Sequence, residues 1–276
     1  MTMSKQKHKR VALITGASSG MGKDFALRLL EEGYVVYGAA RRTERMQDIA
    51  NKGGVVLAMD MTDEAAMRAG VDRIISEHGR IDLLINCAGY GQYGTLEEVP
   101  IELARRQFEV NLFGLARLTQ LCLPHMRAQG GGRIVNISSI GGKMSTPLGG
   151  WYHASKFALE AFSDVLRNET RQFGIKVVVI EPGGIASEWR GIAADEAARH
   201  SGSGVYAGLV TAFAKAQAAL GKQPGPKVIT DLLMRALSSR RPKPRYVGGQ
   251  MAMPILFLRR WLSDRMFDRV VMASFK

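Results

Sequence analysis

Short apolar runs alternate with longer amphipathic stretches along most of the chain. The runs are rich in β-branched residues, which favour strands, and they predict seven strands at residues 10–15, 34–39, 55–59, 82–86, 133–138, 176–180 and 245–247. Helical spacing predicts helices over residues 21–32, 43–51, 63–78, 152–173 and 226–239, and two more within 101–129. Continuous apolar strands separated by helices are typical of a parallel sheet covered on both faces. The predicted fold class is therefore α/β, a doubly wound parallel Rossmann sheet.

The last third of the chain departs from this alternation. Gly, Ser and Ala become frequent between residues 182 and 224, where one or two helices are expected. Residues 254–271 predict one amphipathic helix whose apolar face holds Leu258, Leu262, Met266 and Val270. The expected organisation is a disordered basic start, one Rossmann domain and a basic amphipathic extension, at residues 1–9, 10–250 and 251–276.

Composition narrows the class of protein. The 276 residues are 46% hydrophobic and 23% charged, which excludes a wholly disordered or collagen-like chain. Two cysteines, Cys87 and Cys122, are too few for a disulfide framework or a four-cysteine zinc site, and they fit a reducing compartment. No apolar run reaches about 18 residues, so no membrane-spanning helix is predicted. The start of the chain lacks the apolar segment of a secretory signal, and a cytoplasmic location is expected.

The formal net charge of +13 is concentrated at the two ends of the chain. Residues 1–10 carry +4 and residues 240–276 carry +7, so the remaining 229 residues carry only +2. A nucleic-acid-binding fold more often spreads its basic residues over one face of the domain. No nucleic-acid partner is therefore expected, and the basic C-terminal end needs a different explanation.

A glycine-rich turn joins the first predicted strand to the first predicted helix. The segment Thr15-Gly-Ala-Ser-Ser-Gly-Met-Gly22 stands where a dinucleotide fold places its phosphate-binding turn. Gly16 can supply the tight turn, Gly20 lets the backbone approach a pyrophosphate, and Gly22 lets helix and strand pack closely. The free N–H groups and positive dipole of the helix N-terminus would then bind the anion. A glycine-rich turn without a ligand is the alternative.

The end of the second predicted strand distinguishes the two nicotinamide dinucleotides. A site for NAD places an acid there, about 20 residues after the glycines, to bond the ribose hydroxyls. This chain has Ala40 followed by Arg41 and Arg42. A guanidinium can pair with a 2′-phosphate through two hydrogen bonds, whereas an acid would repel it. We therefore predict NADP(H), with Arg41 as the main contact and Ser18 or Arg42 assisting, against the alternative of solvated surface charges.

Tyr152 and Lys156 lie four residues apart on a predicted helix and therefore share one face. A free tyrosine has a pKa of about 10, but a nearby ammonium favours the phenolate. Tyr152 could then deprotonate an alcohol, or as a phenol protonate a carbonyl oxygen, while hydride moves to or from a nicotinamide. A solvated pair on a helix face is the commoner explanation of such a spacing. The position after the fifth predicted strand favours the catalytic interpretation.

Together with other motifs, these residues resemble the short-chain dehydrogenase/reductase family, and within it the NADP-preferring, hydroxysteroid dehydrogenase-like members. The motifs are Thr-Gly-x-x-x-Gly-x-Gly at 15–22, Asp60, Asn-Cys-Ala-Gly at 86–89, Asn111, Ser139, Tyr152, Lys156 and Pro182-Gly183. They occur in the family's order and spacing from residue 10 to residue 182, with looser similarity to residue 250. Their joint occurrence is far more specific than any single motif.

The resemblance implies a role for each catalytic position. Tyr152 is expected to be the acid/base, while Lys156 lowers its pKa and holds the nicotinamide ribose. Ser139 is expected to hydrogen-bond the substrate oxygen, and Asn111 is expected to hold a water of the proton relay. Ser139 lies thirteen residues before Tyr152, the spacing usual in the family, so Ser138 is expected to be structural.

The resemblance also implies a cofactor site. Asp60 is expected to meet the adenine, Asn86 and Gly89 to shape the floor of the site, and Ser187 to replace the usual threonine near the carboxamide. Cys87 stands where the family has a second asparagine, and a packed residue without thiol chemistry is expected. The other expected cofactor contacts are Gly16, Ser18, Ser19, Gly20, Met21, Gly22, Arg41, Arg42, Met61, Ala88, Tyr152, Lys156, Pro182, Gly183 and Ile185.

Four large apolar residues fall in segments that flank the substrate side in the family: Met144, Leu148, Trp151 and Trp189. They predict an apolar substrate pocket, and core packing is the alternative for each. His153 follows Tyr152 but lies about 100° further round the helix, so it is not expected to be catalytic. No metal is expected, because no ligand spacing links the histidines.

The C-terminal extension interleaves large apolar groups with arginines and has four interpretations. It could be a lid for a lipophilic substrate, an interfacial helix on anionic lipid, a dimer contact of the kind common in the family, or a surface helix with solvated arginines. A homo-oligomer is expected in any of these cases.

The expected function is an NADP(H)-dependent oxidoreductase that interconverts a secondary alcohol and a carbonyl compound. The substrate is expected to be lipophilic, such as a steroid-, retinoid- or acyl-like compound. One alternative is a ketoacyl reductase for carrier-bound chains, whose acidic carrier would meet the basic tail. A second alternative is a non-catalytic dinucleotide sensor or scaffold, although such proteins typically lose the tyrosine or the lysine that this chain retains.

Overall fold

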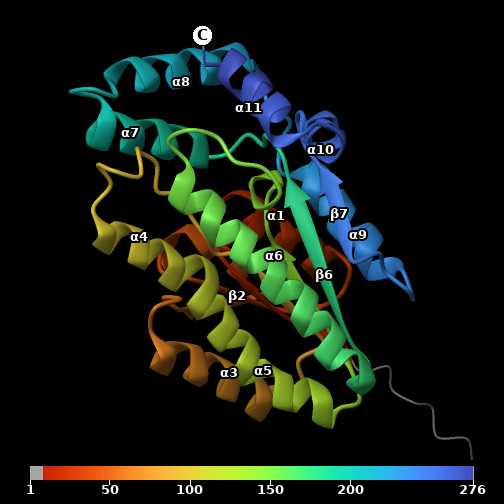
Figure 1. Ribbon diagram of the computed structural model, residues 1–276. Helices are drawn as coiled ribbons and strands as arrows, with labels where there is room; N and C mark the ends of the chain where they lie inside the picture. Colours follow the sequence, from red (N-terminus) through yellow and green to blue (C-terminus); the bar gives the residue numbers. More distant parts are fainter. Residues whose placement is uncertain (1–8, 276) are drawn as a thin grey trace, which may run out of the picture.

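The structure is a computed structural model that describes residues 9–275, and a seven-stranded sheet runs through it (Figure 1). The strands are β1 Val11–Thr15, β2 Val35–Ala40, β3 Val55–Ala58, β4 Leu83–Asn86, β5 Gly132–Ile137, β6 Ile175–Pro182 and β7 Arg245–Gly248. Their order in the sheet is β3-β2-β1-β4-β5-β6-β7, and every neighbouring pair is parallel. The Rossmann class and the strand number predicted from the sequence are confirmed. The order reverses between β1 and β4, which is where ligands bind in such sheets.

Helices cover both faces of the sheet, and alternate residues of each strand point to opposite faces. On β1, Ala12 and Ile14 pack toward one layer, whereas Val11 and Leu13 pack toward the other. The first layer contains α1 Gly20–Glu31, α2 Gln47–Asn51 and α9 Lys227–Ser238. The second contains α3 Glu64–His78, α5 Leu115–Ala128 and α6 Gly150–Thr170, which lie in front of the sheet in Figure 1.

The segment 101–129 holds two α-helices, as predicted, but they are joined end to end. The chain is helical without a break through α4 Ile101–Phe108, a π-helical turn at Glu109–Gly114, and α5. At Gly114 an added Cβ would lie 1.9 Å from the carbonyl oxygen of Met61, so the helix approaches that loop more closely than any side chain permits. Wide turns of this kind are often found at functional sites, and this one carries Asn111.

After β6 the chain crosses the carboxyl ends of the strands before it completes the sheet. This C-terminal part, residues 183–275, contains α7 Trp189–Ser201 and α8 Ala207–Ala219, the two helices allowed by the sequence. It then adds α9 and β7 to the sheet and ends in α10 Ala252–Trp261 and α11 Asp264–Ala273. In Figure 1 these last two helices lie beside α8 at the same end of the molecule.

The tail is two helices, so the prediction of one helix over 254–271 is wrong. Leu262 is extended, with φ −87° and ψ 142°, and Ser263 starts α11. The inward-facing residue of α11 is the buried Phe267, while Met266 and Val270 of the predicted apolar face are exposed. The helical period did not reveal the break, because a serine–aspartate pair can begin a helix inside an otherwise continuous pattern. The predicted disordered start lies outside the described residues except for Lys9, which is exposed and in no helix or strand.

Arg245 of β7 fastens the C-terminal part to the rest of the sheet. Its guanidinium lies 3.0 Å from Glu160 and 2.7 Å from Asp164, both on α6, and 3.1 Å from Glu181 on β6. Burial, with the neighbouring charge of Glu160, raises the pKa of Glu181 to about 7. The arrangement therefore places two nearly buried carboxylates under one arginine.

Candidate active site

The glycine turn after β1 has the close packing that its sequence predicts. Gly16 has φ +70°, and an added Cβ would lie 2.9 Å from the backbone nitrogen of Ala88. An added Cβ on Gly22 would lie 2.3 Å from the carbonyl oxygen of Gly16. The Thr15 hydroxyl accepts hydrogen bonds from the backbone N–H groups of Cys87 and Ala88, each at 3.0 Å. The turn is thereby held against the end of β4 by contacts that no larger residue allows.

The first turn of α1 retains an unneutralised positive end. Its N-cap residue, Ser19, makes no capping hydrogen bond with its side chain, and the first turn contains no acidic residue. Free N–H groups at such a helix start are suited to a phosphate. The cradle formed by Gly16 and Gly22, with this helix start, therefore fits the pyrophosphate of a dinucleotide. Ser18 and Met21, two other predicted contacts, lie in the same turn, Ser18 being buried and Met21 partly buried.

One of the two arginines after β2 contacts this turn, while the expected contact of Arg41 with a 2′-phosphate stays a prediction. Arg42, rather than Arg41, donates to the hydroxyl of Ser19 at 3.3 Å. Glu188 joins the group from the C-terminal part, 3.5 Å from Arg42 and 2.8 Å from Arg45. The structure therefore brings two cations and one anion to the edge of the glycine turn.

Asp60 follows β3, and Arg41 influences it electrostatically. Its carboxylate accepts hydrogen bonds from the backbone N–H and the hydroxyl of Thr62, each at 2.9 Å. Burial acts to raise the pKa of Asp60, but these hydrogen bonds and the charges of Arg41 and Arg106 outweigh it and hold the pKa below its usual value. Asp60 is therefore an ionised acceptor. Met61, another predicted contact, is buried next to it.

Tyr152 and Lys156 lie on one buried face of α6, as their spacing predicts. They are only 8% and 7% exposed, respectively. The ammonium of Lys156 donates to the carbonyl oxygen of Ile137 at the end of β5, at 2.9 Å. The same α6 face continues through Glu160 and Ser163. The alternative of a solvated pair on a helix surface is therefore excluded.

Ser139 lies after β5, next to Tyr152. Its hydroxyl accepts from the backbone N–H of Gly141 at 3.0 Å and donates to the carbonyl oxygen of Pro182 at 3.4 Å. It also lies close enough to Tyr152 to act against the rise in the pKa of that phenol. The neighbouring Ser138 is buried away from this group, and its hydroxyl has no partner among the described residues. His153 contacts Gly141 at 3.0 Å and Thr146 at 3.1 Å, so that it fixes the loop carrying Ser139. His153 is therefore a positioning residue.

Asn111 is buried and contacts α6 through Ser155. Its side chain accepts from the N–H of Tyr90 at 3.1 Å and donates to the carbonyl oxygen of Tyr90 at 2.9 Å and to Ser155 at 3.1 Å. A Cβ on Gly89 would lie 3.2 Å from Asn111 and 3.7 Å from the Lys156 ammonium. The side chains of Asn111 and Lys156 therefore both approach the backbone at Gly89, a residue expected to shape the floor of the cofactor site.

Burial sets the protonation of Tyr152 and Lys156. It raises the pKa of Tyr152 to about 12, against the lowering effect of the Ser139 hydrogen bond. It lowers the pKa of Lys156 to about 8, although Cys87 and Glu160 act in the opposite direction. The sequence predicted that Lys156 would lower the pKa of Tyr152, but desolvation of the phenolate is the larger effect here. Tyr152 is thus a protonated phenol at neutral pH.

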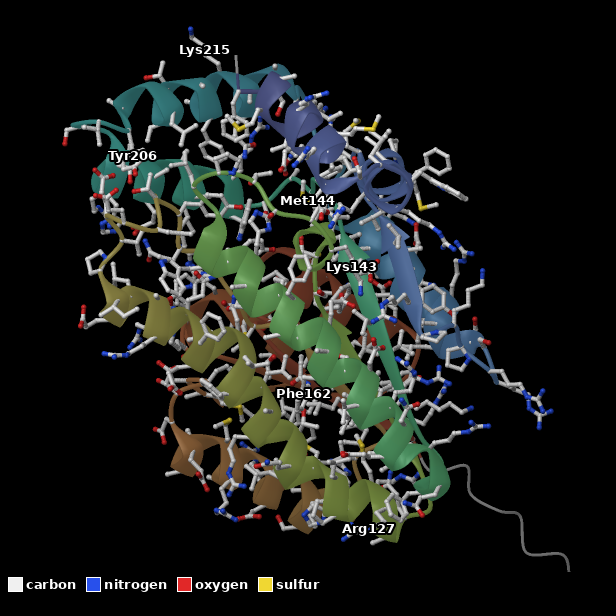
Figure 2. All side chains as sticks on the ribbon, viewed as in Figure 1. Arg127, Lys143, Met144, Phe162, Tyr206 and Lys215 are labelled. Carbon is white, nitrogen blue, oxygen red and sulfur yellow. The ribbon has the colours of Figure 1, made fainter. Side chains whose placement is uncertain are left out.

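An aromatic cluster covers Tyr152 on the side away from the sheet. Trp189 lies 5.3 Å from the Tyr152 ring and 5.4 Å from Tyr93, and Tyr93 stacks on Phe213 at 5.5 Å. Leu148 packs in the same cluster, so two of the four predicted pocket residues meet at Tyr152. Met144 is buried and Trp151 half-buried, and neither belongs to this cluster among the described residues. Figure 2 places Met144 on the loop below α10 and α11.

The remaining predicted contacts line the end of β6 and the floor of the site. Gly183 bonds to the carbonyl oxygen of Gly248 at 2.7 Å, which ties Pro182 and its loop to β7. Ile185 is buried, and Ser187 reaches the glycine turn, since its Cβ lies 3.9 Å from a Cβ placed on Gly20. The segment after β6 therefore lies directly over the predicted phosphate site.

A model of the short chain dehydrogenase family matches residues 10–197 of the chain. The chain belongs to the short-chain dehydrogenase family. An NADPH-dependent 3-dehydrocapnine reductase from Ornithobacterium rhinotracheale is 32% identical over 97% of this chain and 98% of its own length. A 3-ketodihydrosphingosine reductase from Bacteroides thetaiotaomicron is 45% identical over 63% of each chain. A solved short-chain dehydrogenase from Streptomyces avermitilis, 30% identical, superposes with a TM-score of 0.78 over 96% of this chain and 99% of its own.

As a short-chain dehydrogenase the protein is an oxidoreductase that uses a nicotinamide dinucleotide. Within residues 9–275 no helix has the length and apolar character needed to cross a membrane. The same residues contain no group of three or more side chains arranged to hold a metal ion. Both cysteines are free, and burial raises the pKa of Cys87 and of Cys122 to about 12, which leaves them as unreactive thiols.

Several contributors to this dehydrogenase site were missed from the sequence. Asn86 donates to Asn136 at 2.9 Å, and Asn136 donates to Ser163 at 2.9 Å, which forms a buried polar chain beneath the Lys156 face. Isolated polar residues inside apolar strands were the available signal, since such residues are buried only with partners. Tyr93 and Phe213 carried no such signal, because they come from segments about 120 residues apart that only the fold brings together.

Proposed function

We propose that the protein is an NADP(H)-dependent reductase that interconverts a lipophilic ketone and the corresponding secondary alcohol. The observation that carries the proposal is the buried Tyr152–Lys156 pair, which meets Ser139 on one side and the aromatic cluster on the other. Such an arrangement brings a proton donor, an oxygen ligand and an apolar surface to one point. These are the groups that carbonyl reduction requires from the protein.

Tyr152 performs the proton transfer in this proposal. When bound, the dinucleotide supplies the hydride to the carbonyl carbon or accepts it from the alcohol. In reduction, the Tyr152 phenol gives its proton to the carbonyl oxygen, which Ser139 holds by a hydrogen bond. The Lys156 ammonium and a water held by Asn111 then return a proton to the phenolate. The reverse sequence removes the proton from an alcohol.

The raised pKa of Tyr152, about 12, favours the reducing direction near neutral pH. A protonated phenol is the form that reduction needs, whereas oxidation needs the phenolate. The rate of reduction is therefore expected to stay nearly flat up to about pH 10, where Tyr152 is still protonated, while the rate of oxidation rises with pH. Initial rates in both directions, measured between about pH 6 and 10 at saturating cofactor, would show this difference. A rate of oxidation that falls with increasing pH would contradict the role of Tyr152.

The choice of NADP(H) rests on Arg42 and Arg41, with Arg42 closer to the glycine turn through its bond to Ser19. Each guanidinium can form a charge-assisted bond to a 2′-phosphate, worth about 1.5–3 kcal/mol. Replacing either by alanine should raise the KM for NADPH about tenfold or more and leave the KM for NADH within about twofold. Arg68→Ala, on exposed α3, is the matched control. Equal use of NADH and NADPH by the unaltered protein would contradict this choice.

A lipophilic substrate is supported by the apolar surroundings of Tyr152. Leu148, Trp189 and Phe213 offer no charge there, so a polar substrate would lose hydration without compensation. Two relatives are named as reductases of 3-ketodihydrosphingosine and 3-dehydrocapnine, the latter NADPH-dependent. A substrate panel read by NADPH absorbance should show kcat/KM rising with chain length. It should include sphingoid ketones, steroid ketones, retinal and short polar ketones.

The panel also tests the two alternatives. A ketoacyl reductase would prefer a chain on an acidic carrier protein to the free ketone, and exposed basic residues near the C-terminal end, such as Arg240 and Arg241, favour such a carrier. A non-catalytic dinucleotide sensor would bind NADPH and turn over none of the compounds. Preference for free lipophilic ketones would exclude both.

We also propose a homo-oligomer, in the cytoplasm, built on the α5–α6 side. Phe113, Phe157 and Val165 are each about half exposed there, and isolated subunits rarely leave such large apolar residues together. The free thiols fit a reducing compartment. Light scattering should find a dimer or tetramer, and Phe113→Glu combined with Phe157→Glu should shift it toward the monomer. A monomer at micromolar concentration would contradict the proposal.

A further inference from the structure

The outer face of α10 carries three large apolar side chains in a row. Met253, Phe257 and Trp261 lie four residues apart and are 64%, 63% and 70% exposed. The rings of Phe257 and Trp261 lie 6.3 Å apart. The opposite face of α10 packs on the protein through the fully buried Ala252. The side chains of α10 project away from the body of the molecule in Figure 2. We call these three residues the α10 stripe.

The two tail helices hold four arginines and two aspartates. Arg259 is used internally, because it lies 2.9 Å from Asp264 and over the ring of Phe267 at 5.4 Å, which fixes the angle between α10 and α11. Arg260, Arg265 and Arg269 are exposed and form no ion pair with any residue that the structure describes. Arg260 therefore adjoins the stripe on α10, and Arg265 and Arg269 add two exposed cationic groups on α11.

We propose that α10 and α11 form an interfacial anchor that binds the surface of an anionic lipid membrane. A large apolar face with arginines beside it is the pattern of helices that lie in the headgroup region, with the apolar side buried about 5–10 Å deep. Tryptophan is favoured at that depth because its ring is apolar and its N–H is polar. Each arginine near an anionic surface adds to the attraction. Binding requires no membrane-spanning helix.

A lipid surface fits this face better than a second copy of the chain does. In a twofold contact the same patch faces itself, so the surface that carries Arg260, Arg265 and Arg269 would face a second surface of the same positive charge. Like charges brought together across an interface oppose association. Large apolar residues that a second copy could cover, Phe113 and Phe157, are exposed on other elements. The anionic membrane is therefore the occupant for which the charges are complementary.

The anchor is connected to the active site by stacked rings. Phe275, just after α11, stacks on Phe213 at 6.2 Å, and Phe213 stacks on Tyr93 at 5.5 Å. Tyr93 lies 6.0 Å from Tyr152. Docking of the α10 stripe would therefore hold the aromatic cover of the active site close to the lipid. This last link rests on the proposed lipophilic substrate, whereas membrane binding itself does not.

Vesicle binding by the full-length protein tests the anchor without any activity measurement. Flotation with vesicles of phosphatidylcholine alone, or mixed equally with phosphatidylglycerol, should recover the protein only with the anionic mixture. Phe257→Ser combined with Trp261→Ser should lower the partition coefficient at least about tenfold. The matched control, Leu96→Ser combined with Val205→Ser, removes equally exposed apolar residues elsewhere and should stay within about twofold.

Charge and fluorescence variants make the test specific. Reversing Arg260, Arg265 and Arg269 to glutamate should abolish binding to anionic vesicles, whereas the same reversal of Arg105, Arg240 and Arg241 should preserve most of it. Trp261 emission should shift to shorter wavelength on anionic vesicles, and Trp261→Phe should lose that shift while still floating. Equal binding to neutral vesicles, or equal losses in both arginine sets, would overturn the proposal. So would a stripe variant that leaves vesicle binding unchanged and dissociates an oligomer.

Discussion

The cofactor half of the molecule, residues 11–182, and the C-terminal part, residues 183–275, are built in different ways. In the cofactor half, function depends on backbone contacts that permit one residue type, such as Gly22 against Gly16 or Gly114 against Met61. In the C-terminal part, function depends on exposed and packed large side chains on amphipathic helices, where many apolar residues would serve. The cofactor half therefore tolerates few substitutions at the positions that hold the cofactor. The C-terminal part tolerates more, and its side chains determine which substrates and surfaces the protein contacts.

The largest effect is expected from Lys156→Met in the cofactor half. The methionine keeps the volume but removes the charge and the proton donor beneath Tyr152. We expect kcat/KM to fall about 10²–10⁴-fold, the usual effect of removing an acid–base group, with an unchanged circular dichroism spectrum. Lys143→Met removes another lysine close to α6, one that pairs with Glu160 at 3.0 Å, and should change kcat/KM less than about threefold. Similar losses in both variants would place the effect in Glu160 rather than in Tyr152.

Arg245→Met breaks the connection between the two parts. It removes the arginine that pairs with the buried Glu160 and Glu181 and leaves only Lys143 to offset them, so unfolding in urea should show a loss of about 3–5 kcal/mol at pH 8. Arg68→Met removes an exposed pair with Glu64 and should cost less than about 1 kcal/mol.

The loss in Arg245→Met should also depend on pH. The folded pKa of Glu181, about 7, lies above its ordinary value of 4.5. Its protonated form therefore stabilises the fold below about pH 4.5, and this contribution disappears as pH rises through 7. Without the arginine the pKa of folded Glu181 should rise further, because only Lys143 then offsets the ionised carboxylate, and the decline in stability should extend to higher pH. A loss that is larger at pH 5.5 than at pH 8 would contradict the assignment.

Two glycine substitutions, one in each part, should differ by a smaller amount, but they compare the two parts with the same chemical change. Gly22→Ala places a Cβ 2.3 Å from the Gly16 carbonyl oxygen, so it should cost about 1–3 kcal/mol and weaken cofactor binding at least about tenfold. Gly208→Ala, in α8 with open space around it, should leave cofactor binding unchanged and stabilise the fold by up to about 1 kcal/mol. Thermal denaturation and cofactor titration measure both quantities. Equal effects of the two substitutions would contradict the claim that the cofactor half tolerates substitution less than the C-terminal part.

The same contrast explains how much could be predicted from the sequence. The sheet, the glycine turn and the Tyr152–Lys156 face were predictable because period and spacing are local properties of the chain. The π-helical turn at Asn111 was not, because it depends on the approach of Gly114 to a loop more than 50 residues earlier. The position of Arg42 beside Ser19 and the stacking of Phe275 on Phe213 likewise depend on tertiary contacts.

Tyr152→Phe tests the central claim most directly. The change removes one hydroxyl and preserves the ring that contacts Trp189 and Tyr93. NADPH consumption with the best ketone of the panel should fall about 10²–10⁴-fold in kcat, while the dissociation constant for NADPH stays within about twofold. Turnover of that ketone within about threefold of the unaltered protein would contradict the assignment of Tyr152 as the proton donor.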